Sequence, residues 1–142
     1  MEDYGAEAHP ELLHTVLDTT DVRSLAEFYR QLLGLVYRPG DDPPPAGTSD
    51  DADWLVLTDS AGARKLAFQQ VDELPRTTWP LQDVPQQLHL DMTVPDRAAM
   101  DRQRDRAVAL GAELRLDRTH DPDEPLYALA DPAGHIFCIF VK

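Results

Sequence analysis

Two histidines occupy matching places in a repeated stretch of this sequence. Residues 13–21 read LHTVLDTTD and residues 88–96 read LHLDMTVPD, so one offset aligns His14 with His89 and Asp21 with Asp96. Imidazole side chains bind metal ions and transfer protons near neutral pH. A single histidine on a strand is more often a hydrogen-bonded structural residue. Because the histidine is duplicated at matching positions, a functional role and a structural role for the two residues are about equally expected, and both stay open.

The alternation of side chains along a strand predicts where these histidines point. In QLHLDMTV, residues 87–94, His89 and Asp91 fall on one face, and the leucines and Met92 fall on the other. The apolar face should contact a helix. We therefore expect His89 and Asp91 on the face away from the helices, with His14 and Asp18 facing the same way from the matching strand.

A helix is predicted after each aspartate of the repeat. Residues 22–34 read VRSLAEFYRQLLG and residues 97–111 read RAAMDRQRDRAVALG, with apolar residues at helical spacing, less regularly in the second. Asp21 and Asp96 stand at the position of N-caps, and a Leu-Gly step closes each helix. Short strands should then begin at Leu35 and at Ala112.

The second half of each unit is also repeated. Residues 53–71 read DWLVLTDSAGARKLAFQQV and residues 125–141 read PLYALADPAGHIFCIFV, each with an Asp-x-Ala-Gly turn between two apolar strands. The sequence thus predicts an α+β fold of two tandem βαβββ units that form a curved mixed sheet around a central cup. Residues 1–142 should make one domain, with units at about 11–71 and 86–142.

Two proline-rich stretches interrupt these elements. Residues 72–87 connect the units, and residues 38–53 form an acidic loop inside the first. We expect the loop to be a solvated insertion, with a mobile rim over a site as the alternative.

Charge and composition exclude several classes of partner. The formal charge of −13 disfavours nucleic acid and anionic membranes, and favours neutral or cationic small molecules. No apolar run reaches the length of a membrane span, and the acidic start MEDYGAEAHPE does not resemble a signal peptide, so a cytoplasmic protein is expected. The single cysteine, Cys138, excludes an internal disulfide and an all-cysteine metal site.

The paired units, the run Phe28 to Gly34 (FYRQLLG) and the terminal ADPAGHIFCIFVK resemble the vicinal-oxygen-chelate superfamily over roughly residues 12–141. This superfamily includes glyoxalase I, bleomycin-resistance proteins, fosfomycin-resistance enzymes and extradiol dioxygenases. The stretches LHLDMTVPD and DPAGHIFCIF are most similar to its glyoxalase-like branch.

The resemblance implies a divalent metal site with ligands from four inner strands. Carried over by position, these ligands are His14, His89, Gln69 and Cys138, with Gln70 as the alternative register for Gln69. Cys138 departs from the pattern, because a glutamate is usual there. Two imidazoles and a thiolate suit zinc, nickel or iron better than magnesium or manganese. A buried apolar cysteine is the competing interpretation, and Asp91 or Asp18 could supply the missing carboxylate.

Two functions remain open, and the sequence does not decide whether the protein is an enzyme. The first is a cup that binds a neutral or cationic small molecule and requires no metal, with Trp54, Trp79 and Tyr127 as aromatic candidates beside His14, Gln69, His89 and Asp91. The alternative is a metal-dependent lyase, isomerase or extradiol-type dioxygenase that uses His14 and His89. In either case the resemblance and the open sheet edges predict a homodimer.

Overall fold

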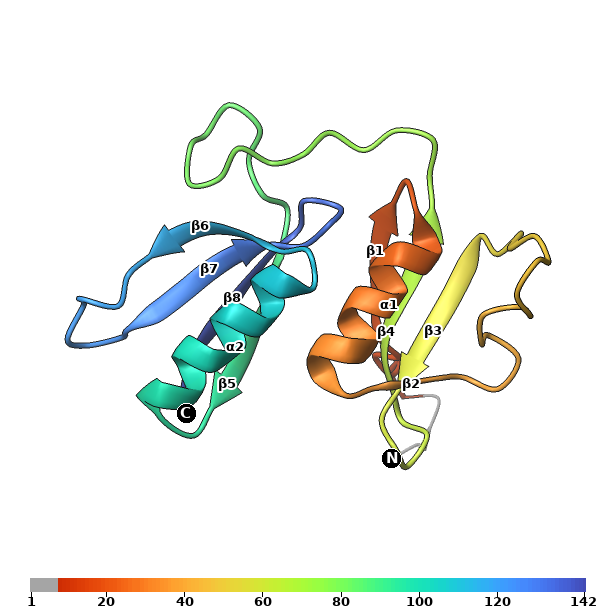
Figure 1. Ribbon diagram of the computed structural model, residues 1–142, viewed down its shortest axis with the longest axis horizontal. Helices are drawn as coiled ribbons and strands as arrows, with labels where there is room; N and C mark the ends of the chain where they lie inside the picture. The colour runs from red at the N-terminus through yellow and green to blue at the C-terminus, as the bar shows by residue number, and fades with distance from the viewer. Residues whose placement is uncertain (1–7) are drawn as a thin grey trace.

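The computed structural model describes residues 8–142, so the acidic stretch MEDYGAE, on which the expectation of a cytoplasmic protein partly depends, lies outside the described residues. The chain folds into two modules of the same element order (Figure 1). The first contains β1 (Thr15–Thr19), α1 (Val22–Leu33), β2 (Val36–Tyr37), β3 (Trp54–Thr58) and β4 (Arg64–Gln70). The second contains β5 (His89–Val94), α2 (Arg97–Ala109), β6 (Glu113–Asp117), β7 (Leu126–Ala130) and β8 (Ile136–Val141).

Both helices begin at the predicted caps. The Asp21 carboxylate accepts a hydrogen bond from the Ser24 amide, and Asp96 does the same for Ala99. Helix α1 ends at Gly34, whose φ of 67° is the left-handed conformation that glycine adopts without strain. The strands β2 and β6 begin one residue later than expected. No helix in the described part of the chain is long and apolar enough to cross a membrane.

The strands form two separate four-stranded sheets, which we call sheet 1 and sheet 2. Sheet 1 has the order β1-β4-β3-β2 and sheet 2 the order β5-β8-β7-β6, with β1 parallel to β4 and β5 parallel to β8. The predicted α+β fold of two βαβββ units is confirmed. The curved sheet of that prediction is divided between the two modules, since no strand pairing within residues 8–142 joins them.

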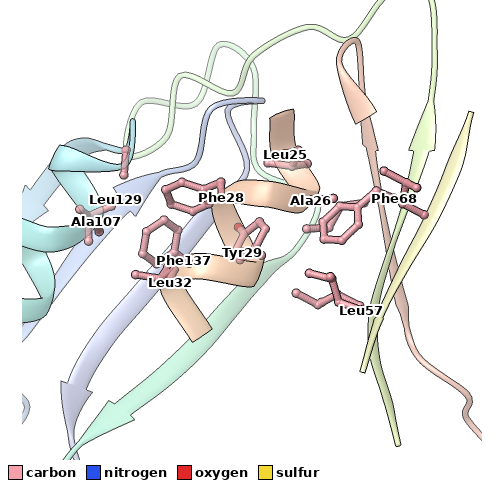
Figure 2. Packing of buried hydrophobic residues seen from close by; sticks show 14 of the residues in the cluster. Leu25, Ala26, Phe28, Tyr29, Leu32, Leu57, Phe68, Ala107, Leu129 and Phe137 are labelled. Atoms are coloured by element: carbon pink, nitrogen blue, oxygen red, sulfur yellow. The ribbon is translucent and has the colours of Figure 1, made fainter. Parts of the chain in front are cut away.

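One hydrophobic core lies between the two sheets. Figure 2 shows Phe28 and Tyr29 of α1 between Phe68 of sheet 1 and Phe137 of sheet 2. The Phe28 and Phe137 rings are 5.9 Å apart, and Tyr29 and Phe68 stack at the same distance. Both sheets therefore turn their helix-covered faces toward a shared core. The other face of each sheet, which we call its open face, points away from that core (Figure 1).

Polar contacts also join the modules. The Tyr29 hydroxyl donates to the buried carboxylate of Asp131 at 2.6 Å, and Arg106 of α2 donates to the carbonyl oxygen of Leu32 at 3.1 Å. The ring of His135 lies 2.7 Å from the carbonyl oxygen of Asp18. The contacts of Asp131 and His135 fix the turn between β7 and β8 against α1 and the end of β1.

The acidic loop of residues 38–53 is anchored rather than free. Arg23 of α1 donates to the Asp50 carboxylate and to the Asp41 carbonyl, each at 2.7 Å. The Asp41 carboxylate accepts from the Val56 amide at 2.9 Å. These bonds support the expected insertion and give no support to a mobile rim.

Candidate functional site

The open face of sheet 2 carries His89 and Asp91 on the predicted side. Along β5, Leu90, Met92 and Val94 pack against the shared core, while His89 and Asp91 are exposed on the other face. Register places Asp91 opposite Cys138 of β8. A second hydrophobic cluster lies on this face; it contains Leu126, Ala128, Ala130, Ile136 and Cys138, with Trp79, Leu116 and Phe140 against it.

A hollow of about 280 Å³ lies over this cluster. Trp79 and Gln86 of the connector form one wall, and Arg118 and Glu124, which flank the β6–β7 hairpin loop, form another. Arg115 of β6 holds the connector in place, because its guanidinium donates to the carbonyl oxygens of Thr77 at 2.9 Å and of Trp79 at 3.0 Å. We call this space the sheet 2 hollow.

Three donor groups converge at its floor. One ligand atom each from His89, Asp91 and Cys138 lie within 4.8 Å of one another. His89 Nε2 is 3.4 Å from Asp91 Oδ1, and the two side chains are 44% and 53% exposed. Such a mixed set of nitrogen, oxygen and sulfur donors suits zinc or iron better than magnesium.

The chemistry of Cys138 opposes metal binding at this point. The residue is only 8% exposed and belongs to the apolar cluster. Burial, together with the nearby negative charge of Asp91, raises the pKa of the Cys138 thiol to about 11. A metal ligand must be the thiolate, so at neutral pH an incoming ion would first have to displace a tightly held proton.

The open face of sheet 1 carries the other predicted ligands. His14 precedes β1, and its ring centroid lies 6.1 Å from that of Trp54 on β3. The Nδ1 atom of His14 is buried and has no hydrogen-bond partner among the described residues. Burial, and then the charges of Arg64 and Arg38, lower the pKa of this imidazole, which favours its neutral form.

The structure shows which of the two glutamines, Gln69 or Gln70, lies on the open face of sheet 1. Gln70 lies on the helix side, where its carbonyl oxygen accepts from the Val22 amide at 2.9 Å and its nitrogen donates to Thr20 at 2.6 Å. Gln69 pairs with Asp18 and lies on the open face. Because Asp18 is four residues beyond His14, the Cα atom of Gln69 is roughly 13 Å along the sheet from that of His14.

The four residues that the resemblance implies as ligands lie on two different faces of the chain. His14 and Gln69 lie on the open face of sheet 1, and His89 and Cys138 lie on the open face of sheet 2. Tyr127, an aromatic candidate for the cup, lies on neither of these faces. Its ring packs in the shared core, and its hydroxyl donates to Asp101 of α2 at 2.7 Å. Trp79, in contrast, lines the sheet 2 hollow.

Sequence reasoning missed the remaining lining residues. Gln86, Leu116, Arg118 and Glu124 reach the hollow through the course of the connector and the register of β6 on β7. The Gln86 Oε1 atom is buried without a partner among the described residues. No signal in the sequence placed the connector against sheet 2, apart from its tryptophan.

Comparisons with known proteins agree with this architecture. The model of the glyoxalase-like domain family matches residues 14–140. A possible glyoxalase from Bacillus cereus is 16% identical with a TM-score of 0.62, over 92% of this chain and 97% of that one. A glyoxalase/bleomycin resistance protein/dioxygenase family enzyme from Burkholderia phytofirmans is 19% identical with a TM-score of 0.65, over 93% and 98%.

A fosfomycin resistance protein from Listeria monocytogenes, complexed with Mn(II) and a dihydroxypropylphosphonic acid, is 18% identical with a TM-score of 0.66, over 93% of this chain and 92% of that one. No curated protein matches the sequence. At these identities the solved structures show the fold alone. Since the family model covers nearly all of both modules, the chain belongs to the glyoxalase-like domain family.

Proposed function

We propose that this protein binds a neutral or cationic small molecule in the sheet 2 hollow and requires no metal to do so. The observation that carries the proposal is the composition of that hollow. Its apolar wall comes from Trp79, Leu126 and Phe140, and its polar rim includes the carboxylates of Asp91 and Glu124. Small-molecule sites in proteins commonly combine an apolar surface with a few polar groups that orient the ligand.

The charges support a preference for neutral or cationic compounds. Asp91 is more than half exposed, and its only ion-pair contact among the described residues is with His89, which is charged only when protonated. Glu124 is 64% exposed and 3.1 Å from Arg118. The whole chain carries a formal charge of −13, which raises the local concentration of cations.

A metal-dependent lyase, isomerase or dioxygenase is the second candidate. It is favoured by the convergence of His89, Asp91 and Cys138 within 4.8 Å. The raised pKa of Cys138 and the placement of His14 on the other sheet weigh against it. We therefore rank metal-independent binding first.

We further propose that two copies of the chain assemble so that the open face of sheet 1 in one copy covers the open face of sheet 2 in the other. Within one chain these faces point away from a shared core, so His14 and His89 could line one cup only in such a dimer. The edge strands β1, β2, β5 and β6 also leave backbone groups available for pairing.

The test is a thermal-shift screen of chelator-treated protein with neutral, cationic and anionic aromatic compounds and a cationic glycopeptide of the bleomycin type. Neutral or cationic compounds should raise the melting temperature. For a cationic compound, the affinity should fall as salt rises and should drop at least fivefold in Asp91→Asn, because screening and loss of the carboxylate both weaken the attraction.

Asp105→Asn is the matched control, since Asp105 is an exposed carboxylate on α2, away from the hollow. It should leave the affinity unchanged. A screen in which only phosphorylated or polycarboxylate compounds stabilise the protein would overturn the proposal.

A further inference from the structure

The connector between the two modules contains a compact segment, residues 77–84, which we call the connector lobe. Its own hydrogen bonds close it. The Thr77 hydroxyl and the Thr78 amide both donate to the carbonyl oxygen of Val84, at 2.5 and 2.9 Å. The Val84 amide donates back to the Thr78 hydroxyl at 2.9 Å, and the Trp79 amide donates to the Thr77 hydroxyl at 3.1 Å. The lobe therefore holds its own shape and can dock as one unit.

Arg115 makes every hydrogen bond between the connector lobe and the rest of residues 8–142. Its Nη1 atom donates to the carbonyl oxygens of Thr77 and Trp79, at 2.9 and 3.0 Å. Its Nε atom donates to the Glu113 carboxylate at 3.0 Å, which orients the guanidinium. Hydrogen bonds from a charged donor are stronger than neutral ones, and the Arg115 side chain is only 16% exposed. One guanidinium thus attaches the lobe to sheet 2.

A β-bulge in β6 brings Arg115 to the open face of sheet 2. Leu114 pairs with Leu129, which belongs to the shared core. Leu116 pairs with the neighbouring residue of β7, Ala128, which belongs to the apolar cluster under the sheet 2 hollow. Arg115 is therefore the extra residue of β6. The bulge gives the open face two consecutive side chains, Leu116 against the cluster and Arg115 against the lobe, where regular alternation would give it one.

Trp79 is the residue through which the lobe reaches the hollow. Its side chain packs against the apolar cluster and lines the hollow, while its carbonyl oxygen is one of the two acceptors for Arg115. A large, flat indole supplies much of the contact area where it lines a small-molecule site. The position of this indole depends on the lobe, and the position of the lobe depends on Arg115.

From this arrangement we infer that Arg115 is the positioning residue of the sheet 2 hollow, because it holds the connector lobe where Trp79 forms the wall for a bound ligand. Without this guanidinium the lobe would be docked for only part of the time, and the apparent affinity for a ligand would fall with the docked fraction. The ligand part of the inference rests on the proposed function, whereas the hold of Arg115 on Trp79 does not.

The first measurement is acrylamide quenching of tryptophan fluorescence in the full chain carrying Trp54→Phe. The chain has two tryptophans, so the signal of this background comes from Trp79 alone. Arg115→Gln should increase the quenching and shift the emission to longer wavelength, because the released indole contacts water. Arg115→Lys, which keeps the charge and loses the forked donor, should reverse part of both changes.

The second measurement is the affinity of benzamidine, a small aromatic cation, for the chain with both tryptophans. Arg115→Gln should weaken benzamidine by about tenfold or more, the loss expected for one hydrogen bond from a charged group. Trp79→Ala should weaken it at least as much. In the Trp79→Ala variant, Arg115→Gln should cost little more, because Arg115 acts through Trp79.

Arg106→Gln is the matched control. Arg106 of α2 also donates to two main-chain carbonyl oxygens, those of Gln31 and Leu32, but on the helix side of the sheets. Its substitution should leave the Trp79 signal and the benzamidine affinity unchanged, whatever its effect on the melting temperature. Melting curves check that each variant is folded at the temperature of the measurements.

An unchanged Trp79 signal in Arg115→Gln, an unchanged benzamidine affinity, or effects equal to those of Arg106→Gln would each overturn the inference. Full additivity of Arg115→Gln and Trp79→Ala would also do so, because Arg115 would then act by another route. If the unsubstituted protein binds neither neutral nor cationic compounds, the proposed function is contradicted, and the Trp79 signal alone decides whether Arg115 holds the lobe.

Discussion

At the scale of single residues, Cys138 determines whether the candidate site has a charged ligand or an apolar side chain at this position. In the family pattern that the sequence resembles, a glutamate is usual at this place. Here a thiol with 8% exposure joins an apolar cluster, and burial raises its pKa to about 11. The side chain therefore contributes packing at neutral pH, and the carboxylate of this face comes from Asp91, opposite it on β5.

Alkylation of Cys138 should show this raised pKa. The thiolate is the reactive form, and an ordinary thiol, with a pKa of about 8.5, reaches its maximum rate by about pH 9.5. In the native protein the rate of Cys138 alkylation by iodoacetamide should still rise steeply between pH 9 and 10. In the urea-unfolded chain the same rate should level off. Because the folded state holds the proton more tightly, this group should also lower stability as pH rises from about 8.5 toward 11. A native rate that levels off below pH 9 would contradict this account.

The sequence predicted single side chains well only where a strand has one polar face. His89 and Asp91 alternate with Leu90 and Met92, and the structure puts them on the expected side. Tyr127 lies in the strand LYALA, which is buried on both faces, so no alternation distinguished the core side from the hollow.

At the scale of elements, α1 holds the molecule together. It packs on sheet 1 and also contacts Phe137 of sheet 2, and its Tyr29 hydroxyl reaches Asp131 in the turn before β8. Asp131 also accepts from the amides of Ala133 and His135, so one buried carboxylate shapes the turn and joins the modules. Burial raises the pKa of Asp131, which makes its hydrogen-bond partners important for stability.

Tyr29→Phe should therefore destabilise the protein by about 1–3 kcal/mol, because it leaves one oxygen of a buried carboxylate without its donor. Tyr37→Phe is the control. Its hydroxyl donates at 2.6 Å to Glu27, which keeps Arg30 as a partner at 2.7 Å and is 30% exposed, so the loss should be smaller. Urea unfolding measures both. Equal losses of unfolding free energy in the two variants would show that the hydrogen bond from Tyr29 to Asp131 stabilises the protein no more than the one from Tyr37 to Glu27.

Caps and turns made most elements predictable, since Asp21, Asp96 and the two Asp-x-Ala-Gly turns all stand where the structure uses them. The bulge at Lys65 was not predictable. The run RKLAFQQ has no regular alternation, and the pairing of Arg64 with Thr58 depends on the opposite strand.

At the scale of the whole molecule, the duplication in the sequence predicted two equivalent modules but not their relative placement. The helix faces of both sheets are apolar, and packing them together buries one continuous core. Local patterns cannot distinguish that arrangement from two sheets joined edge to edge around a cup, because each module buries its own helix in either case. The location of His14 and His89 relative to each other therefore had to come from the structure.

The open faces of the two sheets point away from each other within one chain, and this placement supports the proposed homodimer. Sedimentation at micromolar concentration should give about twice the chain mass of 15.9 kDa. Since Trp54 and Val36 lie on the open face of sheet 1, Val36→Glu should shift the protein toward monomer, with Val108→Glu on the exposed side of α2 as its control. A single species near the chain mass in the unsubstituted protein would remove the basis for a cup shared between copies.

The central claim is that the sheet 2 hollow binds its ligand without a metal. The direct measurement is the affinity of the best compound from the thermal-shift screen, determined on tag-free protein before and after chelator dialysis, with the metal content of the same samples. We predict well under one equivalent of metal per chain at the start and no change in affinity on chelation. Stoichiometric zinc, nickel or iron that is lost together with binding, and that also disappears in Cys138→Ser, would contradict the account and establish a metal centre at His89, Asp91 and Cys138.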